Sequence, residues 1–277
     1  MRRFYYSMIA AVGILVLSAG VVLAGGKDML LCLPGFPGSS VQAQPYVDKV
    51  LRHLESKLGW PALSMRGVYI PDGEKALKKL QAKKPEIALV GPSIYASQHK
   101  ALKMKVIAQV EVRGQAHQTF SVVTKVGGPK TLAALKGKSL KGSVVHDPKY
   151  VHNILLDGKV PDGSIKLESA NRPLNALRSV ARGQADAAIV SQDVVNHMKE
   201  LPFASELGVI YTSKPVPPPA IVVMGEGVKH AQKLTKILVG MCKQPGGKDL
   251  CKTLTLTSIK AASDKDYSRF ISSYNGR

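Results

Sequence analysis

Several loops of this sequence carry side chains that can bind a small polar solute, and each loop follows a predicted strand. Ser39 and Ser40 follow the first strand, and their hydroxyl groups can either donate to an anion or cap the next helix. A later loop, from His146 to Tyr150, offers an imidazole, a carboxylate, an amine and a phenol. This set can bind a solute of mixed charge, although Asp147 followed by Pro148 is also a plain helix start.

Two further loops add an amide, a guanidinium and a hydroxyl. Asn171 and Arg172 lie immediately before Pro173, a residue typical of the first helical turn. The Arg172 guanidinium can make a bidentate contact to phosphate or carboxylate, or it can be an exposed structural side chain. Ser191 ends another strand, and the nearby Asp193 would repel an anion unless the solute carries an amine or a protonated oxygen. These positions predict a site for a small anionic or zwitterionic solute.

The elements that must position these loops alternate along the chain, which predicts an α/β fold with mainly parallel sheets. Strands are predicted at residues 29–33, 86–90, 106–110, 119–125, 140–145, 165–168, 187–190, 207–212 and 221–224. Helices are predicted at residues 47–58, 74–82, 132–135, 174–182, 194–199 and 228–242, and the remainder of the chain is predicted to be helical. In such a fold, helix amino termini at the carboxyl ends of strands direct unpaired amides at a ligand.

The first 24 residues have the order of a secretory signal. Arg2 and Arg3 precede an apolar run at residues 8–17, and residues 22–24 supply the compact side chains that a signal peptidase recognises. We therefore predict export and cleavage after Ala24. The alternative is an uncleaved membrane anchor, because the apolar stretch continues up to the cleavage site. Cleavage would leave 253 of the 277 residues, which favours two lobes over one small core.

The chain is strongly basic, with 39 Lys and Arg against 19 Asp and Glu. Its formal charge of +20 falls to +18 when Arg2 and Arg3 are removed with the signal. In an exported protein this excess favours anionic solutes, acidic lipid headgroups or envelope polymers as partners, and it argues against nucleic acid. The alternative is a solvated lysine-rich surface without a specific partner.

The three cysteines fit an oxidising compartment with at most one disulfide. Cys242 and Cys251 are predicted to pair, because the turn formed by residues 244–247 can fold the chain back between them. Cys32 lies in an apolar strand and is predicted to be a buried thiol. None of the three has the spacing of a zinc site, so no metal is expected.

The sequence lacks the motifs that mark common enzyme active sites. It has no Gly-x-Ser-x-Gly, no phosphate loop ending in Gly-Lys-Ser or Gly-Lys-Thr, and no His-Glu-x-x-His. His, Asp and Ser are present, but composition alone does not make a catalytic triad. We expect neither catalysis nor a cofactor.

Four segments together resemble the phosphate, phosphite and phosphonate binding family of ABC importers. Residues 86–95, EIALVGPSIY, are similar to a strand and loop of that family with its Gly-Pro and tyrosine. Residues 132–138, LAALKGK, match the helix-to-strand segment before the family's ligand loop. Residues 182–188, RGQADAA, are similar to the entry to a strand of its second lobe. Residues 211–219, YTSKPVPPP, resemble its proline-rich return to the first lobe. Their order along the chain carries more weight than any one segment.

The resemblance implies a two-lobed periplasmic binding protein of type 2 whose chain crosses between the lobes near residues 113–119 and 210–219. After the signal, residues 25–116 with 212–277 would form the first lobe, and residues 117–211 the second. The two crossings would act as the hinge. The resemblance also implies that the ring or hydroxyl of Tyr95 faces the cleft.

In function, the resemblance implies a periplasmic monomer that captures a small ligand, phosphonate-like or phosphate-like, for an ABC permease. One segment departs from the family pattern. Where members that bind phosphonates present serines and threonines with a glycine, this chain has residues 146–150, HDPKY. The fold is therefore supported more strongly than the ligand. A sensor or adaptor of the same fold, coupled to another membrane partner, is the alternative.

Overall fold

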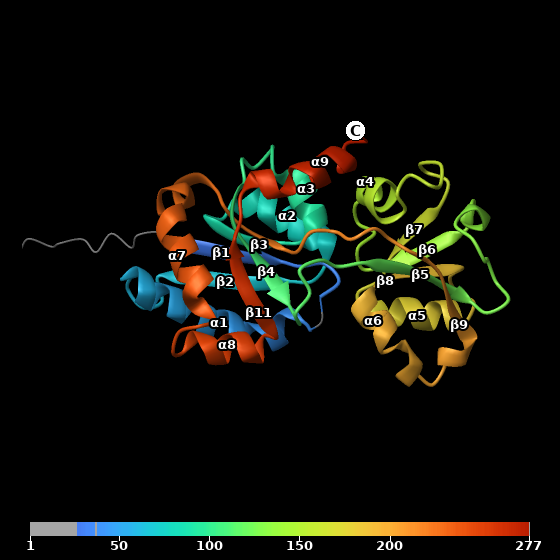
Figure 1. The fold of residues 1–277 in the computed structure, drawn as a ribbon, viewed down its shortest axis with the longest axis horizontal. Coiled ribbons are helices and arrows are strands. Elements are labelled where there is room, and N and C mark those ends of the chain that lie inside the picture. Colours follow the sequence, from blue (N-terminus) through green and yellow to red (C-terminus); the bar gives the residue numbers. More distant parts are fainter. Residues whose placement is uncertain (1–26, 37, 277) are drawn as a thin grey trace, which may run out of the picture.

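In the residues that a computed structural model describes, 27–36 and 38–276, the chain folds into two α/β lobes that lie side by side (Figure 1). The predicted signal, residues 1–24, lies outside these residues. No helix within them combines the length and the apolar character needed to span a lipid bilayer.

The first lobe is built on a sheet with the strand order β11-β4-β10-β3-β1-β2. Its strands are β1 (Lys27–Cys32), β2 (Met65–Ile70), β3 (Ile87–Val90), β4 (Lys105–Val112), β10 (Ala220–Val223) and β11 (Leu256–Ala261). β1 pairs in parallel with β2 and β3, whereas β10 runs antiparallel to β3 and β4, and β11 antiparallel to β4. The sheet is therefore mixed, not mainly parallel as predicted. β10 returns from the second lobe without a helical crossover within the first, so it runs against its neighbours.

The second lobe has a sheet with the order β7-β6-β8-β5-β9. Its strands are β5 (Phe120–Lys125), β6 (Ser139–Gly142), β7 (Lys166–Ser169), β8 (Ala187–Ser191) and β9 (Leu207–Thr212). β6 is parallel to β7 and β8, while β5 is antiparallel to β8 and β9. This sheet is also mixed, because β5 enters and β9 leaves along the crossings between the lobes.

Helices cover both faces of each sheet, so each lobe has an apolar cluster on either side of its strands. On the first lobe, α1 (Ser40–Leu58), α7 (Ala231–Met241) and α8 (Gly247–Thr253) cover one face, and α2 (Gly73–Lys83), α3 (Pro92–Gln98) and α9 (Ser268–Tyr274) the other. On the second lobe, α4 (Pro148–Tyr150) with a π-helical turn at Val151–Leu155 covers one face, and α5 (Pro173–Ala181) with α6 (Gln192–Asn196) the other.

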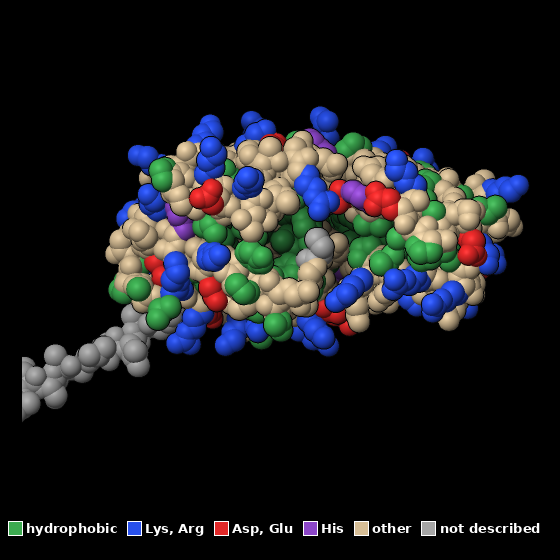
Figure 2. Space-filling view, turned by 90° about the horizontal axis from the view of Figure 1, so that it is seen from below, with side chains coloured by type: hydrophobic (Ala, Val, Ile, Leu, Met, Phe, Trp, Pro, Cys, Tyr) green, Lys and Arg blue, Asp and Glu red, His purple; other side chains and the backbone are tan. Residues whose placement is uncertain are grey.

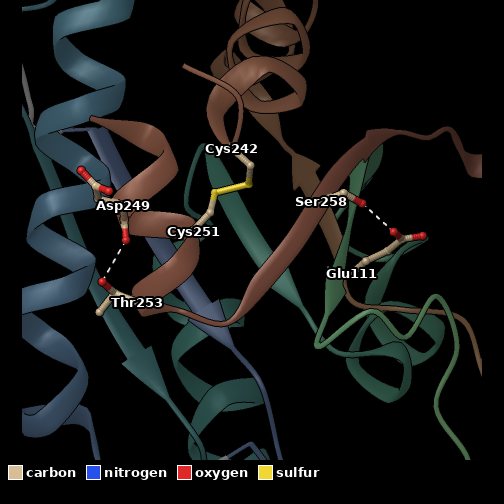
Figure 3. Close-up of a disulfide and its surroundings, with 6 residues drawn as sticks. All are labelled: Glu111, Cys242, Asp249, Cys251, Thr253 and Ser258. Carbon is tan, nitrogen blue, oxygen red and sulfur yellow. Dashed lines mark hydrogen bonds between the residues drawn. A yellow bond between two sulfur atoms is a disulfide. The ribbon is translucent and has the colours of Figure 1, made fainter. Parts of the chain in front are cut away.

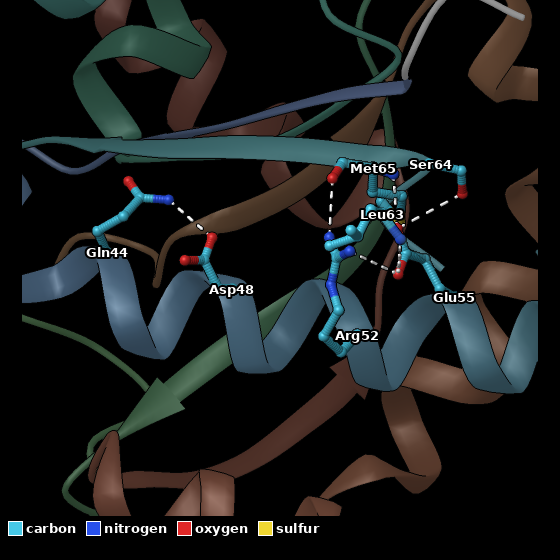
Figure 4. Close-up of polar contacts among 7 residues, drawn as sticks. All are labelled: Gln44, Asp48, Arg52, Glu55, Leu63, Ser64 and Met65. Atoms are coloured by element: carbon cyan, nitrogen blue, oxygen red, sulfur yellow. Dashed lines mark hydrogen bonds and ion pairs between the residues drawn. The ribbon is translucent and has the colours of Figure 1, made fainter. Parts of the chain in front are cut away.

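A buried carboxylate joins the longest of these helices to the edge strand β2 (Figure 4). Glu55 of α1 accepts hydrogen bonds from the backbone amides of Leu63 and Met65, at 3.1 and 2.6 Å. Arg52 pairs with Glu55 at 3.1 Å and donates to the Met65 carbonyl at 2.8 Å. Because these bonds satisfy the buried charge, the start of β2 is attached to the helix that covers it.

Cys242 and Cys251, the pair predicted from the sequence, are joined by a disulfide between the end of α7 and α8 (Figure 3). Cys32 is a free buried thiol in β1, and burial raises its pKa to about 12.

At the β11 edge of the first-lobe sheet, Ser258 of β11 donates to Glu111 of β4 at 2.5 Å, and Lys260 pairs with the same carboxylate at 2.6 Å. The C-terminal segment after α8 is thus a strand, β11, where the sequence predicted helix.

The chain passes between the sheets through residues 113–119 and 213–219, which pair with each other at Gln118 and Val216. The C-terminal helix α9 makes a further connection. Phe270 and Ile271 pack against an apolar cluster of each lobe. α9, which the sequence assigned to the first lobe, therefore contacts both lobes.

Candidate functional site

A small polar cavity of about 90 Å³ lies between the lobes, where strands of both sheets end. From the first lobe it is lined by Pro71, Asp72, Gly73 and Glu74, and from the second by Ser143, His146, Ser169, Ala170 and Asn171. These residues lie at or shortly after the carboxyl ends of β2, β6 and β7. This is where ligands bind in open α/β sheets.

The first-lobe rim is the start of α2. Asp72 caps this helix, and its Oδ1 accepts a hydrogen bond from the Lys75 amide at 2.8 Å. Gly73 is buried, and Glu74 is exposed in the first turn. Two carboxylates therefore border the cavity on this side, at a helix end that also favours negative charge.

The second-lobe rim comes from two adjacent parallel strands. Gly142 of β6 pairs in register with Ser169 of β7, so the loops that follow these strands emerge side by side. They bring the hydroxyls of Ser143 and Ser169 and the amide of Asn171 to the cavity. This rim offers neutral donors and acceptors, in contrast to the carboxylates opposite.

His146 spans the cleft and contacts the first lobe. Its Nε2 lies 3.3 Å from the hydroxyl of Ser93, a buried residue at the start of α3. Its ring lies so close to Gly73 that a Cβ atom at that position would be 2.3 Å from the imidazole. Only glycine therefore allows this contact without a shift of the ring.

The surroundings of His146 favour a neutral imidazole. Burial lowers its pKa, and the carboxylates of Asp147, Asp72 and Glu74 offset this only in part. Within the described residues, the buried Nδ1 atom has no hydrogen-bond partner. The nearby backbone of Ser143 raises the pKa of the ring, but less than burial lowers it. A neutral ring can accept at one nitrogen and donate at the other, so its role depends on the tautomer.

Two of the predicted site residues, His146 and Asn171, line the cavity. Ser39 instead caps α1, where its hydroxyl accepts from the Gln42 amide at 3.2 Å, and Ser40 is the first residue of that helix. The part of their loop that reaches the second lobe is Gly35, where an added Cβ would lie 3.2 Å from the Ser143 hydroxyl.

Tyr95 and Tyr150, which the sequence also predicted as ligand contacts, lie outside the lining of this cavity. Each side chain is 1% exposed. The Tyr95 hydroxyl donates to Asp264 at 2.9 Å. Burial raises the pKa of Tyr95 most, and this hydrogen bond raises it further. Tyr150 lies in the second-lobe core with its ring edge on Phe270. Both helices turn their tyrosines toward the sheets they cover, so these residues stabilise the lobes.

Arg172 and Ser191 lie outside the cavity lining. Arg172 is the exposed residue immediately before α5, and its side chain makes no capping hydrogen bond. Ser191 ends β8 and is half-buried. Asp147, as the alternative interpretation of its loop proposed, caps α4 by accepting from the Tyr150 amide at 3.0 Å.

Sequence reasoning missed Asp72, Glu74 and Ser93. The first two follow β2, a strand that was not predicted, so their loop was not recognised as a strand end. The signal that was available is the run from Ile70 to Gly73, an apolar residue, Pro, Asp and Gly before a helix. Among the residues that the structure describes, no group of three or more His, Cys, Asp or Glu is placed to hold a metal ion.

Two α/β lobes joined by two crossing segments, with a polar cavity between strand ends, define a periplasmic binding protein of type 2. The family described as "ABC transporter, phosphonate, periplasmic substrate-binding protein" matches residues 37–267. The chain belongs to this family, and its role is that of a solute-binding component of a transporter. This family is periplasmic and is not a family of enzymes.

Solved structures show the same fold at low sequence identity. A Xanthomonas citri protein bound to ATP has a TM-score of 0.72 and 14% identity, over 91% of this chain and 97% of that one. The binding protein of an ABC phosphonate transporter from Pseudomonas aeruginosa has a TM-score of 0.65 and 14% identity, over 89% and 84%. PhnD1 from Prochlorococcus marinus, in complex with methylphosphonate, has a TM-score of 0.67 and 14% identity, over 90% and 98%. No curated protein sequence matches the chain.

Proposed function

We propose that the chain captures a small zwitterionic solute, an aminoalkylphosphonate or a compound of like charge, and delivers it to an ABC permease. The observation that carries this proposal is the charge of the cavity lining. Asp72 and Glu74 form one rim, and none of the described residues that line the cavity is Lys or Arg. A solute that is only anionic would be repelled by these carboxylates, whereas an ammonium group would be attracted by them.

The second-lobe rim suits the other end of such a solute. The hydroxyls of Ser143 and Ser169 and the amide of Asn171 can donate to a phosphonate or carboxylate. His146 can donate from one ring nitrogen. Of the residues predicted from the sequence we therefore retain His146 and Asn171 as ligand contacts.

The cavity is small, which supports a closed arrangement of the lobes. A buried water needs about 10–15 Å³, so about 90 Å³ holds roughly six to nine water-sized groups, the size of a small solute. We propose that a solute enters when residues 27–116 with 212–276 and residues 117–211 rotate apart at the cleft, while α9 keeps its contacts with both lobes. The crossing segments at 113–119 and 213–219 would be the hinge of a monomeric protein.

Thermal shift with four matched probes tests the solute class. The probes are an aminoalkylphosphonate, the alkylphosphonate of the same length, the corresponding alkylamine and inorganic phosphate. A ligand at about a hundred times its dissociation constant stabilises the protein by about 2.7 kcal/mol. We expect the aminoalkylphosphonate to raise the melting temperature more than the other three. If no probe changes it, this solute class is wrong.

Charge-neutral variants test the assigned contact. Asp72→Asn keeps a side chain that can cap α2, and Glu74→Gln keeps the length of the original. Loss of a charge-assisted bond costs about 1.5–3 kcal/mol, so each variant should weaken binding of the aminoalkylphosphonate at least tenfold. Asp162→Asn, in an exposed loop outside the cavity lining, is the control and should bind as the parent does. Equal binding of all three variants would contradict the assignment of the ammonium site.

A further inference from the structure

The outer surface of α2 after Glu74 carries a group of lysines and no acidic residue. Its inward residues, Gly73, Ala76 and Leu80, are buried against the first-lobe sheet. The remaining surface of the helix and its C-cap position carry exposed lysines. These are Lys75, Lys78, Lys79, Lys83 and Lys84. None of the five forms an ion pair with another residue in the described part of the chain.

Three more lysines extend this surface from the segment that follows α3. Lys100, Lys103 and Lys105 are exposed and, within residues 27–36 and 38–276, are equally without an ion-pair partner. The end of α3 lies beside α2 (Figure 1), because Gln81 of α2 donates to Gln98 of α3 at 2.9 Å, and the segment with these lysines begins there. We call these eight side chains together the lysine face.

The lysine face has almost no acidic residues of its own. From Lys75 to Lys105 the sequence contains eight lysines and a single acidic residue, Glu86. Glu86 is paired with Lys27 at 3.3 Å. On the other side of the molecule, around α1 and α8, acidic side chains lie among the lysines and arginines (Figure 2). The lysines of such a one-sided cluster repel one another, and an anionic partner would offset this repulsion.

The composition of the lysine face indicates what kind of partner fits. Protein interfaces are depleted in lysine and are anchored by aromatic, Arg and Met side chains. The exposed large apolar residues of the described chain include none between residues 73 and 105, and this segment contains no Arg. Lysines on flexible stems act as point charges without a fixed geometry. They suit a diffuse anionic surface better than a shaped protein pocket.

We propose that the lysine face binds reversibly to a membrane surface of anionic phospholipid. This inference goes beyond the transport function and does not depend on which solute the cleft takes. Each lysine near an anionic bilayer contributes roughly a fivefold factor to the partition coefficient. Docking through α2 and the segment before β4 would hold the first lobe at the membrane and leave the second lobe free to rotate.

Vesicle co-sedimentation tests the proposal with the protein as recovered from the envelope. Vesicles of equal parts phosphatidylglycerol and phosphatidylcholine should sediment the protein, and pure phosphatidylcholine should not. Raising the ionic strength from about 0.1 M to about 1 M shortens the Debye length from about 10 to about 3 Å, so binding should be lost. If the anionic vesicles do not sediment the protein at the lower salt, the proposal is wrong.

Two triple variants of equal net charge separate the lysine face from the overall charge. K78E/K79E/K83E should lower the partition coefficient at least about a hundredfold. K236E/K243E/K248E, on exposed positions of α7, α8 and the turn between them, should lower it less than about fivefold. Unchanged melting temperatures would show that both variants are folded. Equal losses in the two variants would overturn the assignment to this face, as would preferential binding of soluble polyglutamate over the vesicles.

Discussion

Two contacts between the lobes, one at the cleft and one at the C-terminal helix, differ in kind. At the cleft, the His146 imidazole lies against Gly73 and 3.3 Å from the Ser93 hydroxyl. This contact is made by a polar ring, a hydroxyl and a backbone, and it borders the cavity. Hydrogen bonds of this type contribute only about 0.5–1.5 kcal/mol, so the contact can open.

The C-terminal contact is largely apolar and contains a buried carboxylate. Phe270 and Ile271 of α9 pack against clusters of both lobes. The Tyr274 hydroxyl donates to Asp147 at 3.0 Å, and Asn153 donates to the Tyr274 carbonyl at 2.8 Å. Separation of these groups would expose apolar surface and leave the Asp147 charge without its partner.

The comparison shows how one loop can serve a permanent and a reversible contact. His146 and Asp147 are neighbours in sequence, yet the first faces the cleft and the second is held by α9. We therefore expect the lobes to open at the cleft while the C-terminal contact persists.

Tyr274→Ala should have the largest effect on stability. It removes a buried aromatic side chain, which typically costs about 3 kcal/mol or more, and it leaves Asp147 without the hydroxyl that donates to it. Urea denaturation measures the loss. Tyr274→Phe keeps the ring and should lose about half as much, because only the hydrogen bond is removed. A Tyr274→Ala protein as stable as the parent would show that α9 does not hold the lobes together.

Removal of the disulfide should destabilise the first lobe without affecting either contact between the lobes. In the chain-entropy model, the loop closed by Cys242 and Cys251, nine positions apart, contributes about 2–3 kcal/mol. The double variant Cys242→Ser/Cys251→Ser should unfold at lower urea while ligand affinity is retained. Thiol titration of the denatured parent should find one free thiol, and three would contradict the pairing.

Gly73→Ala should open the cleft. The added Cβ would lie 2.3 Å from the imidazole, so the His146 ring must move away from the first lobe. Overpacking of this kind costs about 1–3 kcal/mol. Small-angle scattering should show a larger radius of gyration for the variant. The double variant Gly73→Ala/His146→Ala removes the clash and should return to the parent dimensions. If it stays expanded, the ring is not the cause.

Acid should weaken the cleft contact through His146. Burial lowers the pKa of this imidazole, so between its folded value and the unfolded value of about 6.5 the closed state binds fewer protons than the open or unfolded state. The contribution of the neutral ring is therefore complete above about pH 6.5 and is lost as the pH falls below it. Scattering as a function of pH should show opening in the parent. His146→Gln cannot titrate and should remove this dependence.

Arg113→Ala should have the smallest effect. Arg113, at the crossing segment, forms an ion pair with Asp193 of α6, and both side chains are more than one-third exposed. Exposed pairs of this kind contribute about 0–1 kcal/mol. We expect a change of at most about 0.5 kcal/mol in urea denaturation. A larger loss would mean that an exposed contact between the lobes matters as much as the cleft contact.

The sequence pattern located the interior strands and missed both edges of the first sheet. β1, β3, β4 and β10 are rich in buried apolar residues, so their runs were recognised. β2 contains Arg66 and Gly67, and β11 has Ile259 as its only buried residue. Edge strands are covered on fewer sides and need fewer apolar residues, so they carry a weak signal.

The sequence predicted residues of the second-lobe rim, because the strands before that rim had been recognised. β6 and β7 were predicted, and His146 and Asn171 in the loops after them line the cavity. The opposite rim, Asp72 and Glu74, follows the missed strand β2. Both lobes line the cavity, so the net charge of its lining could not be inferred without the first-lobe rim.

By itself the sequence determined the features that depend on neighbouring residues. Ser39 and Asp147 cap helices within three positions of themselves, Gly59 ends α1 in the left-handed region, and a short turn brings Cys242 to Cys251. Only the tertiary structure decided the features that join distant segments. Tyr95 meets Asp264 across 169 positions, and Asp147 meets Tyr274 across 127. Local bonds need only the geometry of one turn, whereas each of these pairs forms only when the fold buries a tyrosine ring and brings its hydroxyl to a carboxylate from a distant segment.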